Sequence, residues 1–511
     1  MAETATTPVT QPNPDTIPAT NPATKPEAAL PAAPTPEVKP ATPATVISAP
    51  VAPGSAPVPP APAEKPAEVK PADDKTKAAT TPETDKKEGT TRTLTTFNYE
   101  EEPITDIVNA ILLDSIKKKA SDIHFDPTEN GLKIRTRIDG VLFDYSLVPA
   151  YVMKNMLTRI KIISGMNITE TRVPQDGAIK SSLDSINVDL RVSCLPTNIG
   201  EKIVIRILDY SMSAEGVDQL DFSEPNLKKV YSMMSKPNGI ILVTGATGSG
   251  KSTTIYSILQ KLNTEDRNII TVEDPVEMNI EGINQVQVMA DIGLTFANVL
   301  RSILRQDPDT ILIGEIRDDE TARIAVRASI TGHLVLSTIH TNDSLNTLER
   351  LLDMSVERYL LGAALEGVIS QKLARRLCTK CSTERDTNAY EKNVFKNAIN
   401  KDVTKIKTAV GCAECFSGYK GRIAIHEVLL LNQQIRDAIA KNVAKELLRD
   451  LVYSTGTITL LQDGLEKVVQ GSTTFEEIIK LIDIDGDMGK DPNEKAAEAA
   501  TSSETLESLD F

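Results

Sequence analysis

A glycine-rich segment carries the clearest chemistry in this sequence. It runs Gly245-Ala246-Thr247-Gly248-Ser249-Gly250-Lys251-Ser252 and is followed by Thr253. In a loop of this pattern, the glycines let backbone amides wrap the β- and γ-phosphates, the lysine adds a positive charge, and the serine hydroxyl binds Mg²⁺. A glycine-rich turn could match by chance, but an apolar run precedes this loop and a helical pattern follows it. The segment therefore predicts a nucleoside triphosphate site with Mg²⁺ on Ser252.

Four carboxylates follow two later apolar runs. Glu273, Asp274 and Glu277 come at and after the end of the run NIITV, and Glu315 closes the run TILIG. Carboxylates in the first group could hold Mg²⁺ or position water, and the alternative is a solvated acidic loop. Glu315 would lie across from the γ-phosphate, where a general base or a Mg²⁺ partner is expected. We therefore expect Glu315 to polarise the attacking water.

Two histidines flank a further apolar run, LVLSTI. His340 follows the run, so we expect it to contact the γ-phosphate and report it to the rest of the domain, whereas His333 precedes the run and is expected to orient a loop. A structural hydrogen-bonding role is the alternative for either residue. The two remaining histidines, His124 and His426, lie in strand-like runs and are predicted to be structural.

Four of the five cysteines form two Cys-x-x-Cys pairs, 30 residues apart. The pairs are Cys378/Cys381 and Cys412/Cys415. Either pair alone could be a redox motif, but two pairs together favour a closed tetrahedral Zn²⁺ site that stabilises structure rather than catalyses. The fifth cysteine, Cys194, is predicted to be a buried small apolar residue.

These candidate residues require a sheet that brings several strand ends together. The runs IILVTG, NIITVED, TILIGE and LVLSTIH are apolar and alternate with helical segments after Lys251, from 295 to 305 and from 318 to 328. This pattern indicates an α/β domain over 225–482, with a parallel sheet covered on both faces and the active site at the carboxyl ends of the strands. Beyond Tyr359 the pattern predicts helices up to residue 481, interrupted by a zinc module at about 375–422.

A smaller α+β module is predicted at 97–212. A helical stripe at 104–116 opens it, and strand-like runs follow, with turn residues at Asp139-Gly140 and Asp176-Gly177 and a helical segment at 151–166 between them. Residues 213–224 have the composition of a linker.

The ends of the chain have a different composition. Twenty of the 30 prolines precede residue 83, and the first aromatic residue is Phe97, so residues 1–96 are predicted to be disordered. Residues 483–511 are predicted to be an acidic disordered tail, and the partial calcium-loop spacing of Asp483, Asp485, Asp487 and Glu494 is disfavoured because Met488 replaces the glycine. The net charge of −15 is concentrated in these ends, and the mildly acidic middle argues against direct nucleic-acid binding. With no membrane-spanning run and few cysteines, a cytoplasmic location is expected.

The order of these motifs resembles one known family. GATGSGKSTT, TVEDPVE, RQDPDTILIGEIRD and TGHLVLSTIHTND are similar to the four nucleotide-site boxes of the type II secretion and type IV pilus assembly ATPases. ASDIHFDP, RIDG, TRVPQDG, DLRVS and GEKIVIRILD resemble the family's preceding module, and the cysteine segment with GYKGRIAIHEVL resembles its zinc insertion. The resemblance covers about residues 100–480. It implies a RecA-like P-loop ATPase domain behind a PAS-like module.

The resemblance also implies a function. Members of this family are homohexameric motors that hydrolyse ATP at the cytoplasmic face of the inner membrane and drive the assembly of pilin-like subunits into a fibre. An inner-membrane platform protein and cytoplasmic docking proteins are the implied partners, so membrane association would be peripheral. ATP, Mg²⁺ and Zn²⁺ are the implied cofactors.

Site residues carry over by motif. Lys251 and Ser252 would bind phosphates and Mg²⁺, and Glu315 would be the catalytic carboxylate. The resemblance further implies that Glu273 and Glu277 help to place metal and water. It also implies that His333 and His340 form a histidine box. Arg191 and Arg206 match arginines that approach the nucleotide from the preceding module; the alternative is strand-surface charge.

Two departures from the family pattern stand out. Ala246 occupies a position that usually holds proline, and the Ala/Pro-rich tail occupies the place of a folded docking domain. The cysteine insertion favours an assembly or secretion motor over a retraction motor. A nucleic-acid-translocating P-loop ATPase and a slow nucleotide-dependent regulatory protein remain the alternative functions.

Overall fold

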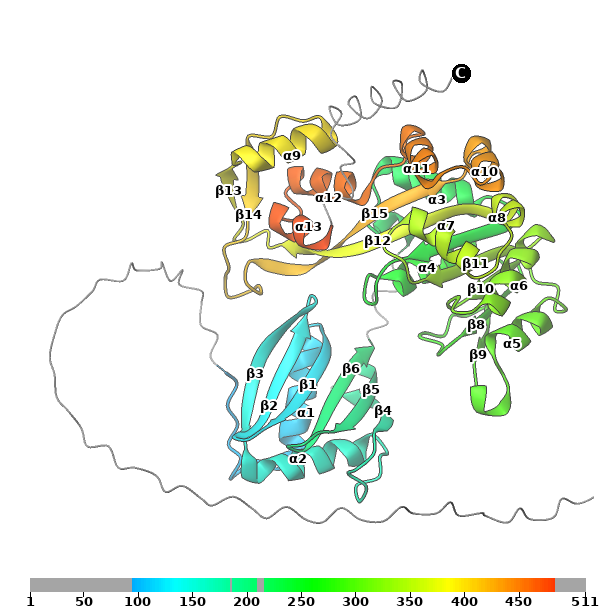
Figure 1. Ribbon diagram of the computed structural model, residues 1–511. Coiled ribbons are helices and arrows are strands. Elements are labelled where there is room, and N and C mark those ends of the chain that lie inside the picture. Colours follow the sequence, from blue (N-terminus) through cyan, green and yellow to red (C-terminus); the bar gives the residue numbers. More distant parts are fainter. Residues whose placement is uncertain (1–93, 184–185, 209–215, 483–511) are drawn as a thin grey trace, which may run out of the picture. The chain divides into compact units, whose positions relative to one another are not determined.

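The computed structural model describes residues 94–183, 186–208 and 216–482. Figure 1 shows two folded modules along these ranges. The acidic segment 483–511, with its calcium-like spacing, and nearly all of the proline-rich segment 1–96 lie outside the described residues. In the part of the chain that is described, no helix has the length and apolarity to cross a bilayer.

The first module is a six-stranded antiparallel sheet with two helices packed on it. The strand order is β3-β2-β1-β6-β5-β4. Alternate residues of the strands point to the helices and form one core with them, as Ile111 of α1 and Ile160 of α2 do with Phe125. The bounds are α1 Ile104–Lys117, β1 Ala120–Thr128, β2 Gly131–Ile138, β3 Val141–Pro149, α2 Ala150–Ile163, β4 Gln175–Leu183, β5 Ile186–Pro196 and β6 Glu201–Leu208.

Both predicted helices of this module are confirmed, and so is the turn at Asp139-Gly140, between β2 and β3. The turn expected at Asp176-Gly177 is wrong, because both residues lie within β4 and pair with β5. Gly177 is needed for packing instead of turning: a Cβ there would lie 2.3 Å from the carbonyl oxygen of Ser164, just after α2.

The second module is built on a seven-stranded sheet of order β15-β12-β7-β11-β10-β8-β9. All neighbouring strands are parallel except β15, which runs antiparallel to β12. The strand bounds are β7 Gly239–Thr244, β8 Ile269–Glu273, β9 Asn284–Gln287, β10 Thr310–Ile313, β11 Leu334–Ile339, β12 Leu365–Leu377 and β15 Tyr419–Leu430. The predicted α/β class is confirmed, and the sheet is mixed because of β15.

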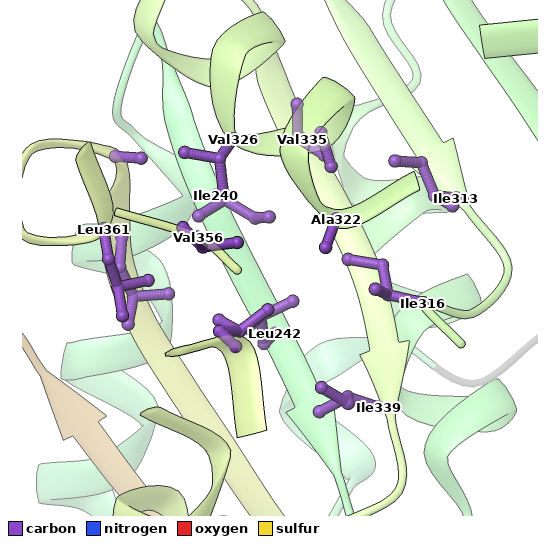
Figure 2. Close-up of a cluster of buried hydrophobic side chains, with 14 of the residues drawn as sticks. Ile240, Leu242, Ile313, Ile316, Ala322, Val326, Val335, Ile339, Val356 and Leu361 are labelled. Carbon is purple, nitrogen blue, oxygen red and sulfur yellow. The ribbon is translucent and has the colours of Figure 1, made fainter. Parts of the chain in front are cut away.

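Helices cover both faces of this sheet. Neighbouring residues of β7 point to opposite sides: Ile240 and Leu242 join the core under α5, α6 and α8, whereas Ile241 and Val243 join the core under α3 and α4. Figure 2 shows the first of these cores, with Ile313, Ile316, Ala322, Val326 and Leu361 around the β7 side chains. The helix bounds are η2 Val217–Gln219, α3 Glu224–Met234, α4 Lys251–Leu262, η3 Ala290–Ile292, α5 Phe296–Ile303, α6 Asp319–Ile330, α7 Ser344–Asp353 and α8 Arg358–Ala364.

Beyond residue 364 the structure departs from the expected run of helices. β12 and β15 form a long two-stranded ribbon that belongs to the main sheet at one end and leads to the cysteine pairs at the other. The inserted segment between them contains a two-stranded antiparallel sheet, β13 and β14, with α9 between its strands. The helices predicted for the C-terminal part of the chain follow β15. Their bounds are β13 Thr383–Asp386, α9 Ala389–Ile399, β14 Lys405–Thr408, α10 Gln433–Ala440, α11 Lys445–Ser454, α12 Leu460–Val469 and α13 Phe475–Leu481.

Candidate active site

The glycine-rich loop lies at the carboxyl end of β7, where the sequence placed it. Thr244 ends the strand, and Lys251 begins α4 six residues after Gly245. Gly248 and Gly250 have φ values of 79° and 90°, a region that residues with a Cβ rarely adopt. The loop therefore needs glycine at both positions to turn from the strand into the helix, whose N-terminus favours anions.

Lys251 is folded over this loop. Its Nζ donates to the carbonyl oxygens of Gly245, at 2.8 Å, and Ala246, at 3.1 Å. Burial lowers the pKa of the Lys251 amine, and the negative charge of Glu315 acts in the opposite direction. The lysine charge is thus held at the mouth of the loop. Ser252, the next residue, is exposed and lines the same cavity.

Glu315 lies two residues past the end of β10 and is mostly buried, with 15% of its side chain exposed. It forms an ion pair with Arg317, and its other oxygen lies 3.5 Å from Nε2 of His340. Arg317 also reaches Asp274, at 3.8 Å. Side chains that follow β8, β10 and β11 therefore lie together, and Asp274, Glu315 and His340 among them line the same cavity as Lys251.

Glu273 ends β8 and is more enclosed than expected for a residue that places metal and water. Its carboxylate accepts hydrogen bonds from Tyr256, from Thr271 at 2.5 Å and from Gln285 at 3.1 Å. Burial and the neighbouring Glu273 charge raise the pKa of Tyr256, which remains a phenol and a donor. Glu273 thus anchors α4 to β8 at the wall of the cavity.

The two candidate arginines differ in their partners. Arg191, on β5, forms an ion pair with Glu277 at 3.1 Å. Arg206, its cross-strand neighbour on β6, pairs instead with Asp122 at 3.1 Å and is 61% exposed. Glu277 lines the cavity, so Arg191 contacts a cavity residue and Arg206 contacts its own sheet.

His333 is not brought to this site. It precedes β11, whereas His340 follows the strand, and six residues of strand span about 20 Å. Its Nδ1 lies 2.9 Å from the carbonyl oxygen of Ala328, at the end of α6. His333 therefore contacts the C-terminal turn of α6, and the role of orienting a loop stays a prediction.

A cavity of about 930 Å³ lies beside the glycine-rich loop. Residues of the glycine-rich loop and the first turns of α4 line it, as do Glu273, Glu277, Glu315 and His340. Other residues that line the cavity were not anticipated from the sequence, among them Tyr256, Gln371 and Arg376. Tyr256 looks like an ordinary apolar-face helix residue in the sequence. Gln371 lies in a segment predicted to be helical and Arg376 in the predicted zinc module, whereas the structure places both on β12.

The four paired cysteines converge at the end of the β12–β15 ribbon. Their sulfur atoms all lie within 4.8 Å of one another. The separations are 3.9 Å for Cys378 and Cys412, 3.7 Å for Cys381 and Cys415, and 3.5 Å for Cys412 and Cys415. Four sulfurs at about 2.3 Å from one Zn²⁺ in a tetrahedron lie about 3.8 Å apart. The donor set and spacing therefore fit a structural Zn²⁺ site.

The sequence is similar to known proteins over most of its length. The family described as "Type II/IV secretion system protein" matches residues 98–480. Type II secretion system protein E of Pectobacterium carotovorum subsp. carotovorum is 47% identical over 380 residues, covering 74% of this chain and 76% of that protein. The type IV pilus assembly ATPase PilB of Thermus thermophilus is 44% identical over 375 residues, covering 73% of this chain and 42% of that protein.

Solved structures share the fold. The pilus retraction motor PilT with bound ADP superposes with a TM-score of 0.50 at 27% identity, covering 76% of this chain and 98% of that chain. The Legionella pneumophila ATPase DotB superposes with a TM-score of 0.56 at 21% identity, covering 75% and 97%. From the sequence match, which spans the cavity residues and the cysteine cluster alike, the chain belongs to the family of Type II/IV secretion system proteins, a family of ATPases.

Proposed function

We propose that this chain is the ATP-hydrolysing motor of a type IV pilus or type II secretion machine, acting as a homohexamer at the cytoplasmic face of the inner membrane. The observation that carries the proposal is the convergence of Lys251, Glu315 and His340 at one sheet edge, beside a loop shaped for phosphates. The tetracysteine cluster and the similarity to type II secretion protein E and PilB support an assembly or secretion motor.

The side chains divide the chemistry among them. Lys251 neutralises charge on the β- and γ-phosphates, and Mg²⁺ held by Ser252 would neutralise more of it. Glu315 polarises a water molecule for attack on the γ-phosphate, and its ion pair with Arg317 orients the Glu315 carboxylate. His340, 3.5 Å from Glu315, passes the presence or absence of the γ-phosphate to α7, which begins at Ser344.

The test separates binding from hydrolysis. We expect Glu315→Gln to retain ATP affinity within about threefold and to lower kcat by at least about a hundredfold, because the amide cannot take up a proton from water. Glu357→Gln, an exposed position at the start of α8, is the matched control and should keep the wild-type kcat. Unchanged turnover in Glu315→Gln would refute the assignment.

The oligomeric state has its own test. We expect the full chain with a non-hydrolysable ATP analogue to sediment as about six copies, since ring motors place a nucleotide where neighbouring subunits can respond to it. A chain that stays monomeric at all nucleotide concentrations would exclude the ring.

A further inference from the structure

Gln371, on β12, is a buried polar residue that hydrogen-bonds both the end of the glycine-rich loop and the start of α4. It is 2% exposed. Its Nε2 donates to the backbone oxygen of Ser249 at 2.8 Å, and its Oε1 accepts from the hydroxyl of Thr254 at 2.6 Å. A backbone carbonyl can only accept, so the orientation of the Gln371 amide is fixed. The side chain thereby joins the last part of the loop to the first turn of α4.

The loop touches Gln371 at both of its ends. A Cβ at Gly245 would lie 2.4 Å from the backbone oxygen of Gln371, and a Cβ at Gly250 would lie 2.6 Å from its Nε2. Glycine at these two positions therefore serves close approach to β12 as well as backbone conformation. The glycine-rich loop therefore packs directly against β12.

The hydrogen bond to Ser249 has a directional consequence. In a trans peptide unit, the carbonyl of Ser249 and the N–H of Gly250 point in opposite directions. Because Gln371 holds the Ser249 carbonyl toward β12, the Gly250 N–H points away from β12. Backbone amides of such a loop are the groups that bind phosphate oxygens.

We propose that Gln371 is a positioning residue of the ATPase: by binding Ser249 and Thr254, it directs the Gly250 N–H toward a nucleotide phosphate. The proposal rests on the proposed ATP-hydrolysing function. A purely structural buried amide is the competing explanation. It predicts lower stability with unchanged nucleotide affinity, because the loop would reach its phosphate-binding shape without Gln371.

Substitutions in the full-length chain distinguish these explanations. Gln371→Glu replaces the donor facing the Ser249 carbonyl by an acceptor, and Thr254→Val removes only the hydroxyl that binds Gln371. With Mg²⁺ present, we expect the Kd for ADP and the KM for ATP to rise about tenfold in Gln371→Glu and about fivefold in Thr254→Val. The change in kcat should be smaller than the change in KM, because both substitutions act on the phosphate-binding shape of the loop.

Thr254→Ser retains the hydroxyl and should return the Kd to within about twofold of the wild-type value. Gln470→Glu, an exposed amide after α12, is the matched control and should leave Kd and KM unchanged. If Gln371→Glu does not fold, the comparison of Thr254→Val with Thr254→Ser decides the question alone.

Two failures can be told apart. Wild-type affinity in both Gln371→Glu and Thr254→Val, with a lowered melting temperature, would overturn the positioning role and leave the ATPase function intact. A wild-type chain that binds no ADP or ATP would overturn the proposed function itself.

Discussion

His426, on β15, is fully buried and stacks on the ring of Phe222, with a centroid distance of 3.8 Å. Its ring nitrogens have no hydrogen-bond partner among the described residues. Burial, with a contribution from the positive charge of Lys467, holds the pKa of His426 well below its ordinary value. The histidine is therefore neutral in the folded protein. Its predicted structural role agrees with this environment.

This burial makes stability depend on pH. Below about pH 6.5 an unfolded His426 binds a proton and the folded one does not, so stability falls as the pH falls. From pH 7.5 to 5.5 we expect a loss of about 1.4 kcal/mol that is absent in His426→Leu. Burial raises the pKa of the neighbouring Asp463, which has the opposite effect, but that contribution is common to both proteins and cancels in their difference.

Urea unfolding at the two pH values measures the effect. Gln470→Leu, a change at an exposed amide that carries no ionisable group, should keep the wild-type dependence. Equal pH dependence in wild type and His426→Leu would contradict the assigned burial.

Single residues were predictable where their chemistry is tied to a local pattern. Lys251 and Glu315 could be placed from the loop motif and from a strand end, because each lies directly next to the element that positions it. Gln371 could not, since its partners Ser249 and Thr254 lie more than a hundred residues earlier. Its role exists only because β12 pairs with β7.

At the scale of elements, β12 is a strand that local sequence periodicity does not predict. Lys372, Arg375 and Arg376 are spaced as on the polar face of a helix, and a strand of mixed polarity lacks a clear period of two. Arg375 fits a strand because it stacks on the Tyr419 ring and pairs with Glu477 on α13. These partners are distant in sequence, so local periodicity could not reveal them.

A glycine on β12 provides a test of this strand's packing. A Cβ at Gly367 would lie 2.0 Å from the sulfur of Met233, on α3, and 2.6 Å from the backbone oxygen of Leu429. The backbone of β15 cannot move aside without breaking the pairing, so Gly367→Ala should destabilise the second module by about 1 to 3 kcal/mol. Gly216→Ala, at an open position with a φ of −67°, should change stability by less than about 0.5 kcal/mol. Thermal unfolding of the two variants makes the comparison.

The cysteine cluster gives a second prediction at this scale. Purified protein should contain about one Zn²⁺ per chain, and Cys412→Ser should lose it and melt at a lower temperature, because a structural zinc site contributes folding energy. Cys194→Ser is the matched control for metal content, since Cys194 is buried in the first module. Metal analysis that finds no zinc in a stable wild-type protein would refute the site.

At the scale of the whole molecule, Arg191 is one of the residues of the first module that reach the cavity, and it does so through Glu277. If it supplies positive charge to the transition state, Arg191→Gln should lower kcat by at least about tenfold with little change in KM. Arg172→Gln changes an exposed arginine that pairs within its own loop and should be neutral. Steady-state ATPase assays compare the two variants. Equal kcat values for Arg191→Gln and Arg172→Gln would show that Arg191 is a surface charge without a role in hydrolysis.

The apolar core around the cysteine module draws on two distant parts of the chain. Val394, Phe395 and Ile406 of the inserted segment pack with Leu460, Leu465 and Ile478 of α12 and α13. During synthesis from the N-terminus, the inserted segment leaves the ribosome well before those helices do. Its apolar side therefore stays uncovered until α12 and α13 have been translated. A stalled or truncated product lacking α12 and α13 would expose this surface, which makes it a target for chaperones and for quality-control proteases.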